Sequence, residues 1–407
     1  SAVRDAKNGP WFVKEIQNRC KFKVNVISGK DEARLSAYGI LSGFPGADGL
    51  VGDLGGGSLE LIQLKGGEPK EKISLPIGPV RVLDGALSFS DEHMHFIEEE
   101  LAKADWLKEL EAKPFYMVGG AWRALAHLHI FETNWPLHVL HGYTIGPETC
   151  KNFCWEIERK TLSTLKGIEA VPPKRLVTLP LAARILREII RIGNPSEIIT
   201  SGYGIREGVM FKKLNHAMRA QDPLIETTKE FGRYTARFPK HGDKLINWTD
   251  GLFPNQNQDK RRIREAVCHS SEISHTSHPD FKAELAFSRS IVGRYVGVTH
   301  KERCMIAVGL YASYGGEQGN KTIASATKIL TRHEIHEAVG IGFLVQFAQK
   351  FTGGTDRPLK KTRIYREDEN LVLEIRSKDS VLISRSVSMR FEKVAAHFGL
   401  NPDIRII

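Results

Sequence analysis

Three glycine-rich turns, each placed directly after an apolar segment, constrain the fold of this chain more than any other feature. The apolar segments and the glycines that follow them are LVGD (50–53) with Gly55, Gly56 and Gly57, FYMV (115–118) with Gly119 and Gly120, and EIIT (197–200) with SGYG (201–204). Glycine has no Cβ, so the backbone can adopt positive φ and another group can approach closely. A two-residue hairpin needs only Asn-Gly or Asp-Gly, so three consecutive glycines require another reason.

One reason is a nest of backbone N–H groups that holds an anion, usually a phosphate. A glycine-rich turn without a ligand explains the first loop alone about equally well. Two of the turns, at 119–120 and 201–204, also open a predicted helix. A strand, a glycine turn and a helix N-terminus together form an anion-binding arrangement, so the three turns indicate more than any one of them.

The order of the predicted elements indicates an α/β fold with a mixed sheet. Apolar periodicity predicts the following segments: helix 9–19, strand 22–29, helix 30–41, three strands joined by glycine turns over 50–78, helix 88–107 with Ser90 as N-cap, strand, turn and helix over 114–129, helix 147–166, helix 180–192, strand 196–202 and helix 203–214. Past about residue 213 the pattern becomes mostly helical. The runs NLVLEIR (370–376) and SVLISRSVSMRF (380–391) are β-like.

Two acids near the first turn are candidates for chemistry. Asp53 lies in an apolar strand two residues before the glycine triplet, where it could hold Mg²⁺ beside a phosphate or simply cap the turn. Glu32 lies in the first turn of the predicted helix 30–41, where the helix dipole alone explains a carboxylate. It could serve as a general base only if this helix faces the glycine loop.

A third cluster recurs at three-residue spacing in CHSSEISHTSH, with His269, Glu272, His275 and His278. These residues could form a metal site, but the three-residue spacing fits a solvated helix edge about as well, and no zinc-protease spacing is present in HEIHE (333–337). Five cysteines without a C-x-x-C pair, no apolar run of membrane-spanning length and no secretory signal predict a reduced, cytoplasmic protein. A formal charge of +10 favours polyanionic partners, with nucleic acid ranked last because it leaves the glycine turns unexplained.

Several segments, in order, resemble one family: SAVRDAKNG, ISGKDEARL, GLVGDLGGGSLEL, LPIGPVRVL, VGGAWRALA and SGYGIREGV. Together they look like the exopolyphosphatase/guanosine pentaphosphate phosphatase family. The resemblance implies an actin-like ATPase fold of two ribonuclease-H-like lobes, then a mainly α-helical HD-like C-terminal region with a small β-containing tail. It divides the chain into 1–48 (remainder of the first lobe), 49–212 (second lobe with the phosphate loop) and 213–407.

The resemblance also implies an activity and its cofactor. Family members release terminal phosphate from inorganic polyphosphate, some also convert guanosine pentaphosphate, and they use Mg²⁺. Carried over by motif, Glu32 matches the base that activates water, and Asp53 matches the acid and metal ligand before the phosphate loop. Arg4 matches an arginine that neutralises phosphate charge. The implied phosphate-binding residues are Gly55, Gly56, Gly57, Ser58, Arg81, Gly119 and Gly120.

Two departures from the family pattern bear on these expectations. The family carries a further phosphate loop of D-x-G-S-x-S type before the position of Ser1, so the first lobe is expected to be incomplete at its N-terminus. The HD-like region has Ser270, not aspartate, after His269, which argues against a working metal centre there. The expected assembly is a homodimer. Two alternatives stay open: a protein that binds polyphosphate or guanosine pentaphosphate without hydrolysis, and an actin-like kinase or ATPase.

Overall fold

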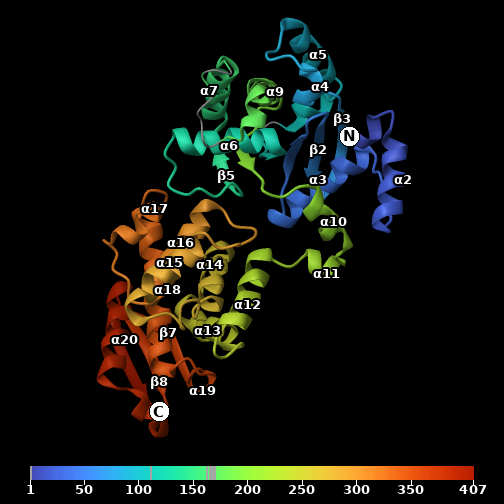
Figure 1. The fold of residues 1–407 in the computed structure, drawn as a ribbon. Coiled ribbons are helices and arrows are strands. Elements are labelled where there is room, and N and C mark those ends of the chain that lie inside the picture. The colour runs from blue at the N-terminus through green and yellow to red at the C-terminus, as the bar shows by residue number, and fades with distance from the viewer. Residues whose placement is uncertain (1, 111, 162–163, 165–170) are drawn as a thin grey trace. The chain divides into compact units, whose positions relative to one another are not determined.

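The chain folds into two compact units, Ser1–Ala220 and Gln221–Ile407 (Figure 1). The structure is a computed structural model and describes residues 2–110, 112–161, 164 and 171–407. In this described part, every helix is too short or too polar to cross a membrane. The predicted domain boundaries at residues 48 and 212 stay predictions.

A mixed sheet forms the centre of the first unit. Its strands, over the described residues, are β1 (Gly49–Leu54), β2 (Leu59–Lys65), β3 (Glu68–Leu75), β4 (Phe115–Val118), β5 (Tyr143–Ile145) and β6 (Ile198–Thr200). They lie in the order β3-β2-β1-β4-β6-β5. β1, β4 and β6 run parallel, whereas β2, β3 and β5 pair antiparallel with their neighbours. This confirms the predicted α/β class with a mixed sheet.

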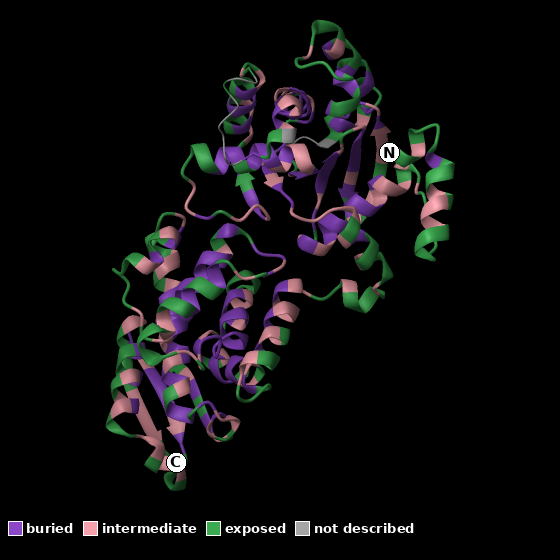
Figure 2. Ribbon diagram, viewed as in Figure 1, coloured by how far each residue is buried: buried purple, intermediate pink, exposed green. Residues whose placement is uncertain are grey.

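Each strand alternates its side chains between the two faces of the sheet, and helices cover both faces. On β1, Leu50 and Leu54 belong to the larger core, whereas Val51 belongs to the smaller one. Strands β1, β2 and β4 are mostly buried, whereas the edge strand β3 is mostly intermediate or exposed (Figure 2). The larger core is covered by α5 (Asp91–Ala102), α6 (Gly120–Glu132), α7 (Pro147–Glu158) and α9 (Leu179–Gly193).

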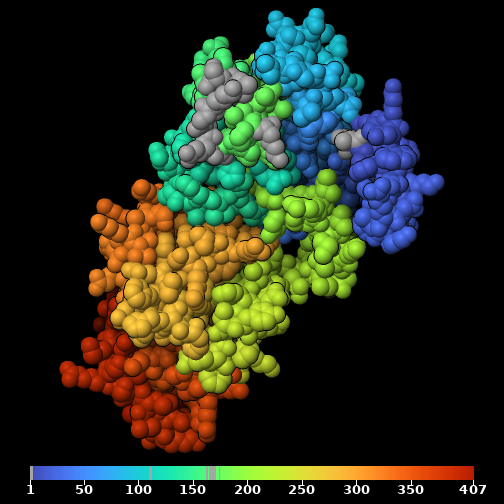
Figure 3. Space-filling model, in the orientation of Figure 1, coloured from blue at the N-terminus to red at the C-terminus, as the bar shows by residue number. Residues whose placement is uncertain are grey.

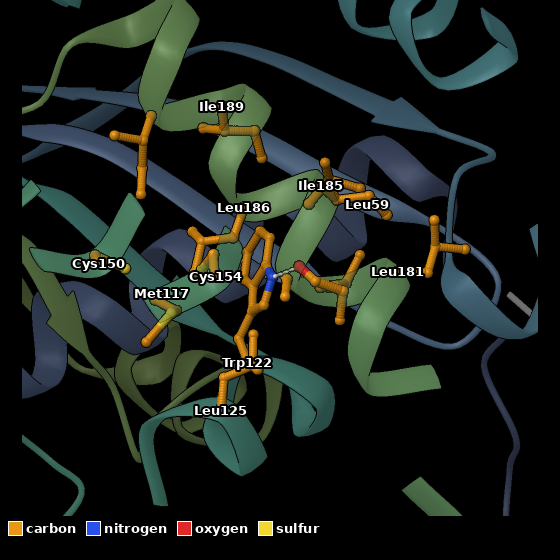
Figure 4. Close-up of a cluster of buried hydrophobic side chains, with 14 of the residues drawn as sticks. Leu59, Met117, Trp122, Leu125, Cys150, Cys154, Leu181, Ile185, Leu186 and Ile189 are labelled. Atoms are coloured by element: carbon orange, nitrogen blue, oxygen red, sulfur yellow. Dashed lines mark hydrogen bonds between the residues drawn. The ribbon is translucent and has the colours of Figure 1, made fainter. Parts of the chain in front are cut away.

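The buried indole of Trp122 organises the larger core (Figure 4). Met117 of β4, Leu125 of α6 and Leu186 of α9 surround it, and its N–H donates to the Ala182 carbonyl at 3.0 Å. The donor of a buried tryptophan is thereby satisfied, so the ring can lie fully inside the core.

The smaller core lies under α3 (Gly29–Gly43) and α10 (Ile205–Lys213). Small residues bring these two helices close together. A Cβ on Gly39 of α3 would overlap the Gly204 carbonyl, and a Cβ on Gly208 of α10 would overlap the Leu35 carbonyl. Asp53 alternates with Leu54 and so lies on this face of β1, toward α3. The short helices α4 (Pro79–Leu83) and α11 (His216–Arg219) complete the unit.

The N-terminal helices α1 (Ala2–Asp5) and α2 (Gly9–Cys20) form a separate bulge on one face of the first unit (Figure 3). The helix predicted at 9–19 is confirmed, but the strand predicted at 22–29 is wrong: residues 22–28 form no strand, and α3 begins at Gly29. The segment meets side chains instead of a neighbouring strand. Its Val24 N–H donates to Gln17 at 3.0 Å, and its Ile27 carbonyl accepts from Arg4 at 2.9 Å.

The second unit is mostly helical, as predicted. Its longer helices are α12 (Pro223–Thr235), α13 (His241–Thr249), α14 (Gln258–His269), α15 (Lys282–Ile291), α16 (His300–Ser313), α18 (Arg332–Thr352) and α20 (Arg385–His397), and its short ones are α17 (Ala324–Thr327) and α19 (Asp356–Leu359). Helix α16 is buried on nearly all sides, which makes it the centre of the unit.

A small sheet follows these helices and forms the predicted β-containing tail. It consists of β7 (Thr362–Glu367), β8 (Asn370–Ile375) and β9 (Asn401–Ile406), with β7 antiparallel and β9 parallel to β8. The β-like reading of 380–391 is wrong, because residues 385–397 form α20. The end of the helix predicted at 147–166 is partly outside the described residues, and α7 ends at Glu158.

Candidate active site

The carboxyl ends of the parallel strands β1, β4 and β6 meet at one edge of the sheet, and each leads into one of the glycine turns. In open α/β sheets this edge is where ligands bind. Gly119, after β4, has φ +98°, and a Cβ there would overlap the Leu54 carbonyl of β1. After β6, the position of a Cβ on Gly204 is 3.9 Å from the Asp53 Oδ2. The three turns therefore surround the end of β1.

The glycine triplet after β1 is not needed for positive φ. Gly55, Gly56 and Gly57 all lie outside the left-handed region. The Gly56 carbonyl accepts from Val80 N–H at 2.9 Å and from Arg81 N–H at 3.1 Å. A Cβ on Gly78 would lie 2.5 Å from the Gly56 carbonyl carbon, so the two backbones are in direct contact. This contact requires a glycine at position 78, whereas Cβ atoms on Gly55 and Gly56 would meet no atom closer than 3.3 Å, so neither expected use of glycine is found at those two positions.

Donor groups are left over at two of these turns. Gly55 N–H is used by the Ser58 carbonyl at 2.9 Å, but within the described residues the N–H groups of Gly56 and Gly57 have no hydrogen-bond partner. Helix α6 begins at Gly120 without a side-chain cap. The first N–H groups of a helix have no intrahelical partner, so both turns can bind an anion.

Asp53 is buried at the end of β1. Its exposed fraction is 9%, and Ser36 Oγ of α3 donates to its Oδ2 at 2.5 Å. Burial raises the pKa of this carboxyl, and the charge of Glu32 raises it further, whereas Ser36 and Arg123 act in the opposite direction. A buried carboxylate without a closely paired cation favours the approach of a positive group.

A second buried acid, Glu60, lies directly across from Asp53 on β2. Ser74 Oγ donates to its Oε1 at 2.8 Å, and Ser58 also hydrogen-bonds it. Burial raises the pKa of Glu60 to about 7, with further contributions from the charges of Glu32 and Asp53. Sequence reasoning missed Glu60, although an acid inside the apolar run LELIQL was a signal.

Glu32 and Arg4 form an ion pair next to these acids. Arg4 Nη1 lies 3.2 Å from Glu32 Oε2, and the same nitrogen donates to the Ile27 carbonyl just before α3. Arg4 Nε lies 3.8 Å from Asp5, which in turn pairs with the guanidinium of Arg81. The structure therefore joins the predicted residues Arg81, Arg4 and Glu32 through Asp5.

Arginines also lie near Asp53. Arg123 of α6 donates to the Gly119 carbonyl at 3.2 Å, and Arg175 donates to the Gly120 carbonyl. Burial lowers the pKa of Arg123, and the nearby positive charges of Arg175 and Arg206 lower it further. The negative charge of Asp53 acts in the opposite direction and raises it. The site thus brings carboxylates, arginines and glycine turns together at the end of β1. Arg175 and Ser36 are further residues that the sequence did not indicate.

The donor set fits a hard divalent cation that also binds phosphate. In the described part of the chain, no group of three or more His, Cys, Asp or Glu side chains is placed to hold a metal by itself. Mg²⁺ usually takes one or two carboxylates together with phosphate oxygens and water. Asp53 matches that pattern, because it is one buried carboxylate that interacts electrostatically with two further acids, Glu60 and Glu32. The same finding leaves the cluster at His269–His278 without a metal site in this part of the chain.

Comparison with family models covers both units. Residues 1–217 match the model described as the Ppx/GppA phosphatase family, and residues 224–401 match the model described as exopolyphosphatase, C-terminal. The first match alone includes more than half of the chain.

Two curated relatives are similar over part of their length. The chain is 25% identical over 347 residues to Retrograde regulation protein 2 of Saccharomyces cerevisiae. The aligned region covers 77% of this chain and 58% of that protein. It is 39% identical over 217 residues to a bifunctional 3-dehydroquinate synthase/phosphatase of Fusobacterium nucleatum, which covers 49% of this chain and 32% of the relative. The chain therefore spans less than two thirds of each of these relatives.

Solved structures give weaker similarity. A Ppx/GppA family member from Aquifex aeolicus is 24% identical with a TM-score of 0.44, covering 52% of this chain and 71% of that one. An exopolyphosphatase from Cytophaga hutchinsonii is 22% identical with a TM-score of 0.48, covering 53% and 74%. The assignment therefore depends on the family model that matches residues 1–217: the chain belongs to the Ppx/GppA phosphatase family.

Proposed function

We propose that this chain is an exopolyphosphatase, which releases terminal orthophosphate from inorganic polyphosphate by attack of water and also accepts guanosine pentaphosphate. One observation carries the proposal. Buried Asp53 lies at the end of β1 near two glycine turns with unused N–H groups, within the electrostatic influence of Arg123 and Glu32. Membership of a phosphatase family supports the same reaction class.

The residues divide the work of phosphoryl transfer, which depends mainly on positioning and charge stabilisation. The N–H groups of Gly56, Gly57 and the start of α6 bind the terminal phosphoryl oxygens. Glu32, fixed by Arg4, takes the proton of the attacking water. Mg²⁺ held by Asp53 supplies positive charge to the phosphate oxygens when bound. Arg123 and Arg175 stabilise the charge that develops on the leaving phosphate.

Further observations support a cellular compartment and a substrate class for this reaction. The five cysteines are free, which suits a reducing compartment such as the cytoplasm. A net charge of +10 favours a long polyanion over a small neutral substrate. We propose a homodimer as the working assembly, as expected from the family resemblance.

A second candidate is binding or sensing of the same phosphate anions without hydrolysis. It is favoured by the relative from Saccharomyces cerevisiae, whose name describes a regulatory protein. The third, an actin-like kinase or ATPase, would use the same turns on ATP and pass phosphate to an acceptor.

The test measures orthophosphate release from long-chain polyphosphate and from guanosine pentaphosphate, with Mg²⁺ and with EDTA. Glu32→Gln should lower kcat by about 100-fold or more, because it removes the base, while polyphosphate still binds. The matched control is Asp31→Asn in the same turn of α3, where Asp31 bonds Ser28 and Arg34 on the exposed side. This control should keep its activity.

The three candidates give different results. Release that requires a divalent ion and Glu32 supports the hydrolase. Saturable polyphosphate binding with no release from the wild-type chain supports the sensor and contradicts the proposal. ATP-dependent phosphorylation of an acceptor without polyphosphate hydrolysis would identify the kinase.

A further inference from the structure

The second unit contains a polar cavity of about 410 Å³ that is separate from the candidate active site. It lies where the ends of several helices meet: the turn after α14, the start of α15, and the carboxyl-terminal parts of α16 and α18. The charged residues that line it are Arg237, Glu272, Lys282, Lys350 and Arg390. We refer to it as the helical-unit pocket.

The pocket has an excess of positive charge. Its one carboxylate, Glu272, is 3% exposed and is already neutralised by Arg237, whose backbone N–H and Nε each donate to it at 2.7 Å. Lys282 and Lys350 have no ion pair or hydrogen bond within the described residues. Arg390 donates from Nη1 only, to the carbonyl and hydroxyl oxygens of Ser386 at 3.0 and 2.7 Å. Within the described residues, Lys282, Lys350 and Arg390 therefore line one cavity without a paired carboxylate of their own.

The walls of the pocket are rigid and present unused polar atoms. Tyr314 OH donates to the Ser271 carbonyl at 2.9 Å and accepts from Ser274 N–H at 3.1 Å, which fixes the turn after α14. Gln349 Nε2 donates to Ser271 Oγ at 3.3 Å, while its Oε1 is buried without a partner. His275 Nδ1 is also buried without a partner. Buried polar atoms normally have partners, so these atoms point to a ligand.

We propose that the helical-unit pocket binds a compact, multiply charged phosphate anion, with the phosphates on Lys282, Lys350 and Arg390. Phosphate oxygens form their strongest hydrogen bonds with cationic donors, and three cations match a di- or triphosphate. An exchange of the two amide atoms of Gln349 turns its unpaired atom into a donor toward the ligand. The cavity is larger than pyrophosphate, which leaves room beside Tyr314 and His275 for the organic part of a nucleotide.

The test is binding of pyrophosphate, ATP and GTP to the whole 407-residue chain, localised by hydrogen–deuterium exchange. Binding in the pocket should slow exchange in residues 270–277 and 344–352. The variant with Lys350→Gln and Arg390→Gln together should lose this protection and bind roughly 100-fold more weakly, at about tenfold for each lost charged hydrogen bond. The control carries Lys378→Gln and Arg385→Gln, which remove the same charges from the same region outside the pocket.

Comparing pyrophosphate with ATP and GTP shows whether the pocket recognises the phosphates alone or a whole nucleotide. Equal protection by pyrophosphate and ATP identifies the phosphates as the ligand, and stronger protection by ATP or GTP identifies a nucleotide. Three outcomes overturn the proposal: no protection of these segments, equal weakening in the control variant, or protection only by long-chain polyphosphate. Unchanged urea midpoints in both variants exclude unfolding as the cause. Because exchange is read in the second unit, the result does not depend on whether the chain hydrolyses polyphosphate.

Discussion

At the scale of single residues, the site depends on acids that are held in a buried environment. Asp53 and Glu60 are cross-strand neighbours on the face of the sheet that α3 covers, and each has a serine donor, Ser36 or Ser74. Burial raises both pKa values, the charge of Glu32 raises both further, and the charge of Asp53 adds to the rise at Glu60. A bound cation would relieve the repulsion among these charges.

Glu60→Gln should stabilise the first unit at high pH. The folded pKa of about 7 is above the ordinary value of 4.5, so Glu60 contributes most stability below pH 4.5 and loses it as the pH rises through 7. Glutamine keeps an oxygen for Ser74 without the charge. We expect a gain on the order of 2 kcal/mol at pH 8 and almost none at pH 4.5, measured from urea midpoints. An equal gain at both pH values would contradict a charged Glu60.

The residues of the site could be predicted only in part. The position of Asp53 before a glycine loop is a local pattern, and the sequence shows it. The roles given to Arg81, Gly119 and Glu32 came from a resemblance and stay predictions. Glu60, Ser36 and Arg175 come close to the site through strand pairing and helix packing over long sequence separations, which no local pattern reports.

At the scale of elements, most segments with an apolar or periodic pattern were predicted, and the errors lie in short, solitary or truncated segments. Strands β1, β2 and β4 have apolar runs followed by glycine, whereas β5 has only three residues, too few for a periodic signal. Strand β6 is as short, but it lies in the apolar run EIIT before a glycine turn. The run 22–29 alternates like a strand but has no neighbouring strand to pair with. Helix α20 was misread as a strand because the segment considered in the sequence, 380–391, ended before the helix does. The buried residues of α20 are Val387, Phe391, Val394 and Ala395, and their helical spacing is visible only when residues after 391 are included.

The β4–α6 turn gives a test of how tightly the elements around the site pack. Gly119→Ala places a Cβ in the space of the Leu54 carbonyl at φ +98°. We expect a loss of about 2–4 kcal/mol from strain and overlap together. Gly46→Ala is the control, because Gly46 has φ +71° with nothing within 4 Å of its Cβ position, so only strain of about 1 kcal/mol remains.

The measurement is the urea midpoint of the first unit for both variants, with binding of a phosphate analogue as a second readout. Gly119→Ala should also weaken phosphate binding, since β1 and β4 must separate to admit the methyl group. If the two variants lose equal stability, then the turn after β4 does not contact β1 as closely as described here.

At the scale of the whole molecule, the two units differ in how their buried groups titrate. The first unit contains groups of opposite effect: burial raises the pKa values of Asp53 and Glu60 but lowers those of His127 and His129. Their contributions to the pH dependence of stability oppose each other. In the second unit, His241, His269 and His397 all have lowered pKa values, chiefly through burial.

The second unit should therefore gain stability between pH 5 and 7 more steeply than the first. His269 has a pKa lowered to about 4 from 6.5, so its contribution is complete above pH 6.5 and is lost as the pH falls toward 4. His241 and His397 act in the same direction. Calorimetry should show two transitions, one of which rises by roughly 5–10 °C over this range while the other moves less. Gly119→Ala assigns them, because it should lower only the transition of the first unit. If the transition of the second unit shifts no more with pH than that of the first, then burial does not control the titration of its histidines. If the chain unfolds in one step at every pH, then the two units do not unfold and titrate independently.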